Sequence, residues 1–134
     1  MEEATEVFFH GDAPRSGNPM SIGAVMTRSG EIIDKVGGVV SYPGTHEKAQ
    51  WEALIQGMYL AAEHGAKRVI MKGDSRTVIN YMNGDFPSRD FKEMEYLMLA
   101  RKVQLNFNQC FFQYVPAENN EVAINLARSS TSMD

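Results

Sequence analysis

The sequence has one cysteine, no long apolar run and no excess of basic residues, and each absence excludes a class of protein. Cys110 is the single cysteine, so no internal disulfide can form, which fits a reducing compartment. No apolar run approaches the ~18 residues that a membrane helix needs. The 13 basic and 17 acidic side chains leave a net charge of −4, which weighs modestly against binding phosphate backbones. The histidines have no zinc-ligand spacing to Cys110.

The size and composition indicate one ordinary domain. The chain has 134 residues, of which 43% are hydrophobic and 22% charged, enough for a buried core without extended disorder. We expect a single domain over 1–134, with its core at about 6–128 and a small, polar, frayed tail at 129–134. The acidic, polar start differs from a secretory or transit signal. These features predict a cytoplasmic protein without a membrane segment.

Hydrophobic periodicity predicts an α/β fold. The period of two and the turn residues predict strands, and the period of 3.6 predicts helices. The predicted strands are 6–11, 22–27, 31–40, 68–72 and 110–115, and the predicted helices are 45–64, 75–82, 91–105 and 119–127. Three consecutive strands favour an antiparallel meander, and the later strand–helix alternation favours two parallel additions. We therefore expect a five-stranded mixed sheet with helices packed on it.

Two aspartates follow predicted strands. Asp12 comes after strand 6–11 and Asp74 after strand 68–72, each beside a glycine that permits close approach of backbone or ligand. If the strands are parallel neighbours, both carboxylates lie at the carboxyl edge of the sheet, where open α/β sheets bind ligands. Such a pair suits Mg²⁺. The alternative is that Asp12 is a turn residue and Asp74 a helix cap.

Four segments in this order carry a resemblance to a known family. They are Asp12-Ala13-Pro14-Arg15-Ser16-Gly17-Asn18-Pro19, the helix 49–58, Gly73-Asp74-Ser75 with Val78-Ile79-Asn80, and Val115-Pro116-Ala117-Glu118-Asn119-Asn120. Together they resemble type I ribonuclease H, in its short forms without a basic protrusion, over about 6–127. The resemblance implies the ribonuclease H-like fold, with helices on both faces of the sheet. It also implies cleavage of the RNA strand of RNA–DNA hybrids by two Mg²⁺ ions that four carboxylates hold.

The resemblance carries over only two of those four carboxylates. Asp12 matches the first aspartate, five residues before Gly17, and Asp74 matches the third. Gln50 stands where the family has a glutamate, and Ile124 stands where it has the fourth aspartate. A neutral amide and an aliphatic side chain are poor ligands for a hard cation. Asp12 and Asp74 are therefore expected to hold at most one Mg²⁺ ion, weakly.

Two interpretations of the altered site stay open. Gln50 shares a helical face with apolar residues, so it is expected to point at the sheet and to donate a hydrogen bond to a carboxylate. The competing idea is that Glu47 or Glu121, each three residues before a replaced position, supplies the missing carboxylate. A carboxylate one helical turn away is displaced by about 5 Å.

The expected substrate contacts are also mixed. The resemblance implies nucleic-acid contacts at Asn18 and Thr45, and Arg76 belongs to a basic rim whose alternative interpretation is ordinary solvated charge. Glu47 near Thr45 would repel phosphate. We expect a domain that binds RNA–DNA hybrid with weak or absent RNA hydrolysis. The alternatives are an active, divergent ribonuclease H rescued by Glu47 or Glu121, and a protein-interaction module that reuses the fold.

Overall fold

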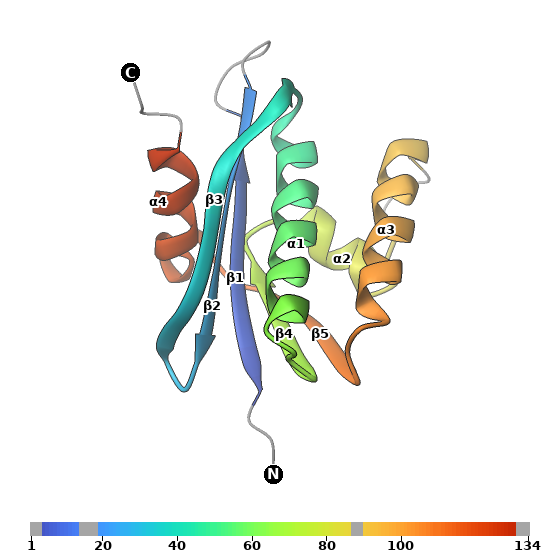
Figure 1. Cartoon of the computed structure of the whole chain (residues 1–134). Coiled ribbons are helices and arrows are strands. Elements are labelled where there is room, and N and C mark those ends of the chain that lie inside the picture. The colour runs from blue at the N-terminus through green and yellow to red at the C-terminus, as the bar shows by residue number, and fades with distance from the viewer. Residues whose placement is uncertain (1–3, 14–18, 87–89, 131–134) are drawn as a thin grey trace.

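Five strands form one mixed sheet in the computed structural model, which describes residues 4–13, 19–86 and 90–130 (Figure 1). The strands are β1 (Thr5–Asp12), β2 (Pro19–Arg28), β3 (Glu31–Pro43), β4 (Arg68–Gly73) and β5 (Gln109–Tyr114). Their order across the sheet is β3-β2-β1-β4-β5. The pairs β1–β2 and β2–β3 are antiparallel, and β1–β4 and β4–β5 are parallel. The predicted α/β class and the mixed sheet are confirmed.

In the described ranges, four helices accompany the sheet, and three of them begin at a side chain that caps the first turn. They are α1 (His46–Glu63), α2 (Arg76–Met82), α3 (Phe91–Gln104) and α4 (Glu121–Ser129), with a short 3-10 turn at Ala117–Asn119 before α4. Thr45 accepts a hydrogen bond from the backbone N–H of Lys48, and Ser75 accepts one from that of Val78. Asp90 caps α3 in the same way. These caps satisfy N–H groups that the helix itself leaves unpaired.

The helices α1 and α4 pack on opposite faces of the sheet, as Figure 1 shows. Successive residues of a strand face opposite sides, and β2 illustrates the consequence. Ala24 lies against Gly57 of α1, whereas a Cβ at the adjacent Gly23 would lie 2.5 Å from the carbonyl oxygen of Ala123 in α4. Glycine at position 23 therefore allows the backbone of α4 to approach the sheet closely.

The core between the sheet and α1 extends to α3 through aromatic packing. Trp51 of α1 is fully buried and stacks on Tyr96 of α3, with ring centroids 5.8 Å apart. α3 packs against α1 and lies at the outer edge of the molecule (Figure 1). None of the helices in the described ranges has both the length and the apolar character of a membrane span.

Candidate functional site

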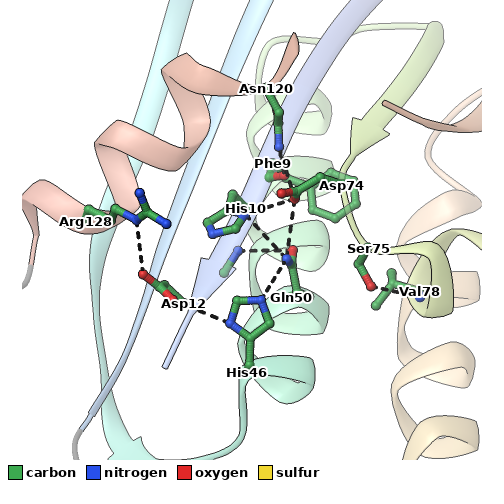
Figure 2. A network of polar contacts seen from close by, with 11 residues as sticks. Phe9, His10, Asp12, His46, Gln50, Asp74, Ser75, Val78, Asn120 and Arg128 are labelled. Carbon is green, nitrogen blue, oxygen red and sulfur yellow. Dashed lines mark hydrogen bonds and ion pairs between the residues drawn. The ribbon is translucent and has the colours of Figure 1, made fainter. Parts of the chain in front are cut away.

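A buried polar network lies at the carboxyl ends of β1 and β4 (Figure 2). These strands are parallel, and their register pairs Phe9 with Gly73, so the next residues, His10 and Asp74, stand side by side. His10 Nδ1 lies 2.9 Å from Asp74 Oδ1, and the two side chains are only 5% and 11% exposed. The centre of the site is therefore a histidine–aspartate pair.

Gln50 reaches this pair from α1. A Cβ at Gly11 would lie 1.9 Å from the carbonyl oxygen of Ala49, so only glycine allows α1 to lie this close to β1. Because α1 lies so close to β1, Gln50 Oε1 accepts a hydrogen bond from the backbone N–H of Gly11 (3.2 Å). Gln50 Nε2 donates a hydrogen bond to Asp74 Oδ1 (3.4 Å). Gln50 thus points at the sheet and donates to a carboxylate, as its helical face predicts, although that carboxylate is Asp74.

Asn120 completes the network from the chain segment before α4. Its Nδ2 donates to the backbone oxygen of Phe9 (2.9 Å) and to Asp74 Oδ1 (3.3 Å). The sequence pattern predicts no role for Asn120 or His10 in this site. His10 lies near the end of a predicted strand and Asn120 near the start of a predicted helix, which are places where site residues are often found. A local sequence pattern does not show that these two side chains meet at Asp74.

The network favours the ionised form of Asp74. Burial by itself raises the pKa of this carboxyl, but the hydrogen bond and charge of His10, together with the hydrogen bond from Gln50, hold the pKa below its ordinary value. Because Asp74 is an acceptor, Nδ1 of His10 carries the proton that joins them. Within the described residues, His10 Nε2 and Asn120 Oδ1 are buried and lack a hydrogen-bond partner.

Asp12 does not join Asp74, and the expected pair of carboxylates is not formed. Asp12 is two residues beyond His10, which places it about 6–7 Å further along the strand. Its described contacts are to His46 Nδ1 (3.4 Å) and to Arg128 Nε (3.6 Å). Figure 2 shows it apart from Asp74. The spacing from Asp12 to Gly17 was a misleading guide, because the position beside Asp74 depends on the β1–β4 register.

The remaining predicted positions supply no further carboxylate to Asp74. Ile124 is buried one turn along α4 from Asn120 and has no atom that binds a hard cation. The carboxyl of Glu47 lies near Glu93 on α3 and raises the pKa of that side chain, and Glu121 is exposed at the start of α4. In the described ranges, no three histidine, cysteine or acidic side chains are grouped as metal ligands. These residues do not fit a two-metal centre.

The predicted nucleic-acid contacts lie around this edge. The Thr45 hydroxyl caps α1 by accepting from the Lys48 N–H at 3.1 Å, and His46 follows it with contacts to Asp12 and Gln50. Arg76 is exposed two residues after Asp74, and its guanidinium lies 4.0 Å from the centroid of the Tyr114 ring. Asn18 lies outside the described residues.

Comparison with solved structures defines the fold. RNase H1 of the archaeon Halobacterium salinarum superposes with a TM-score of 0.91 at 24% identity, over 96% of this chain and 98% of that one. The N-terminal RNase H domain of a Mycobacterium tuberculosis protein gives 0.89 at 20% identity, over 98% and 95%. LC11 RNase H1, solved in complex with an RNA/DNA hybrid, gives 0.87 at 19% identity, over 96% of each chain. The fold is therefore ribonuclease H-like.

Sequence comparison adds the family. The reverse transcriptase-like family matches residues 11–130, which is most of the chain, and ribonuclease HI of Halobacterium salinarum is 26% identical over 123 residues, or 92% of this chain. The chain spans 62% of the length of that curated relative. The protein belongs to the reverse transcriptase-like family, whose members have the ribonuclease H-like fold.

Proposed function

We propose that this domain binds RNA–DNA hybrids and hydrolyses the RNA strand weakly or not at all. The observation that carries the proposal is the arrangement around Asp74 Oδ1, which lies within 3.4 Å of donors on His10, Gln50 and Asn120. The resemblance requires four carboxylates that share two Mg²⁺ ions. Here a single, largely buried carboxylate accepts hydrogen bonds from protein groups instead.

The same arrangement argues for weak metal binding. Mg²⁺ prefers carboxylate oxygens and its own water ligands, and at Asp74 Oδ1 it would compete with three hydrogen-bond donors. Asp12, paired with His46 and Arg128, is not placed to assist. We therefore expect at most one weakly held Mg²⁺ ion in the free protein.

Binding of a hybrid is supported by the fold and by the groups at the site's edge. LC11 RNase H1 is a structural neighbour that was solved with an RNA/DNA hybrid. In this chain the N-terminus of α1 and the exposed Arg76 stand beside the network, where a helix N-terminus and a cation favour a phosphate. Because the chain as a whole has a net charge of −4, the attraction for the phosphates of a hybrid has to come from these local groups.

Titration of a labelled RNA–DNA hybrid at several salt concentrations tests the binding. The affinity is expected to fall with salt, because bound phosphates release counterions. Arg76→Gln should reduce the log–log salt slope by about one. Arg68→Gln, at the opposite end of β4, is the matched control and should leave the slope unchanged. An absence of hybrid binding would favour the protein-interaction module instead.

Restoring the carboxylates tests the loss of hydrolysis. Because His10 is the β1 residue beside Asp74, the restoring set under this proposal is His10→Asp, Gln50→Glu and Ile124→Asp together. We expect the triple variant to cut the RNA strand in Mg²⁺ or Mn²⁺ much faster than the parent does. A parent that already cleaves efficiently, and that loses cleavage on Glu47→Gln or Glu121→Gln, would instead be the divergent active enzyme. Asp74→Asn in the triple variant is the control, since it should abolish the restored activity.

A further inference from the structure

The outer face of α3 carries a line of exposed apolar side chains. Phe91, Met98 and Leu105 are 77%, 68% and 85% exposed. They are seven residues apart, which is close to two helical turns, so they lie on one line along the helix. Large apolar side chains that are this exposed and aligned on one side of a helix mark an interaction surface more often than scattered single ones do.

An apolar groove runs beside this line. It has a volume of about 630 Å³ and is lined by Phe86, Leu97, Met98, Leu99, Arg101, Lys102 and Leu105. The packed face of α3 is already used, since it contacts α1. Among the described residues, the groove and the line of apolar side chains form one face that no other element covers, which we call the α3 face.

We propose that the α3 face binds the α3 face of a second copy of this chain, with the two helices antiparallel. A two-fold axis at Met98 then places each Phe91 against Leu105 of the other copy. The 14-residue α3 is about 21 Å long, so one helix pair covers less surface than a standard protein interface. We therefore expect weak association, with a dissociation constant of roughly 10–500 µM.

Charge complementarity selects the second copy and the antiparallel direction. Glu95 and Lys102 lie three residues before and four after Met98, on the same flank of the apolar line. In the antiparallel pair, Glu95 comes within about 1.5 Å along the axis of the level of Lys102 in the other copy, twice per dimer. A parallel pair would instead set Lys102 beside Arg101 of the other copy. In the described part of the chain, neither Glu95 nor Lys102 has an ion-pair partner.

Charge reversal gives a test that only this arrangement passes. Glu95→Lys alone creates two lysine–lysine pairs in the dimer, and Lys102→Glu alone creates two glutamate pairs. Each variant should dissociate about tenfold more readily, as measured by sedimentation velocity over a concentration series on the full chain. An equimolar mixture of the two variants should form a heterodimer at parental strength, because both of its pairs are again opposite in charge. Glu63→Lys, on α1, is the matched control and should not change association.

Two outcomes would overturn the proposal. One is a parent that remains monomeric up to about 1 mM, which is above the expected range. The other is a parental dimer that persists in Met98→Glu, because that variant sets two carboxylates at the two-fold axis and should abolish the contact. Circular dichroism of each variant checks the fold, which these exposed substitutions should not alter.

Discussion

Replacing His10 by aspartate tests whether the site is stable without a bound cation. His10 Nδ1 is 2.9 Å from Asp74 Oδ1, so His10→Asp sets two carboxylates about 3–4 Å apart. At an effective dielectric constant of about 20, two full charges at that distance repel by about 4–6 kcal/mol. Protonating one of them at pH 7 costs about 4 kcal/mol, from a pKa near 3.9. The folded variant takes whichever costs less, repulsion between two ionised carboxylates or protonation of one of them, so the smaller of these energies is the upper bound. After local relaxation we expect a loss of about 2–4 kcal/mol in the free energy of unfolding.

Denaturant unfolding with and without Mg²⁺ measures this loss. The penalty should shrink by about 2–3 kcal/mol between pH 7 and pH 5, because protonation of one carboxylate becomes cheaper by about 1.4 kcal/mol per pH unit. Millimolar Mg²⁺ should stabilise His10→Asp, since a cation that binds only the folded state raises its stability. The parent should show a much smaller Mg²⁺ response, because it holds at most one ion weakly.

The matched control is His10→Asn, which removes the imidazole without adding a charge. It should cost less than the aspartate, about 1–2 kcal/mol for the lost packing of the ring, because the asparagine amide can still donate a hydrogen bond to Asp74. Its cost should not depend on Mg²⁺. If the parent and His10→Asp are stabilised equally by Mg²⁺, or if the aspartate costs nothing at pH 7, the reasoning about this site is wrong.

Two further changes test the packing around the site. Gly11→Ala should lower the free energy of unfolding by about 3 kcal/mol or more, because its Cβ would lie 1.9 Å from the Ala49 carbonyl oxygen. The control is Gly38→Ala, where the added Cβ has open space and should change the free energy of unfolding by less than about 1 kcal/mol. Equal effects of the two substitutions would contradict the close approach of α1. Burial, with added repulsion from Glu47, raises the pKa of Glu93 to about 7. The folded state then holds this proton more tightly than the unfolded chain, so stability falls as pH rises from about 4 to 7. Glu93→Gln should remove that fall and exceed the parent at pH 8 by about 1 kcal/mol, after allowance for solvent screening, while matching it at pH 4; a variant less stable than the parent at pH 8 would refute this assignment.

The fold was predictable because its signals are local. Apolar periodicity marks each strand and helix, and Thr45 and Ser75 cap their helices through contacts three residues away. The inward direction of Gln50 followed from the helical face that it shares with apolar residues. Each of these inferences needs only the neighbours of a residue along the chain.

Which residue lies beside Asp74 could not be inferred from neighbours along the chain. Counting back five residues from Gly17 selected Asp12, but pairing across the parallel strands β1 and β4 selects His10, through the register that joins Phe9 to Gly73. That register is decided by packing between distant segments, which a spacing within one loop does not report. The role of Asn120 was not predictable for the same reason, since its hydrogen-bond partners Asp74 and Phe9 are 46 and 111 positions away in sequence.

The replacements at this site form one consistent set under our proposal. An ionised carboxylate that is largely buried needs compensation, either from cations or from hydrogen-bond donors. Asp74 draws its donors from three separate elements, namely His10 of β1, Gln50 of α1 and Asn120 before α4. Changing His10 or Gln50 to a carboxylate adds an anion and removes a donor at the same time. Single reversions should therefore be costly without Mg²⁺, and His10→Asp with Gln50→Glu should cost more than the sum of the two, because the two new carboxylates also repel each other. A cation strong enough to hold all of them would reverse the sign of that coupling.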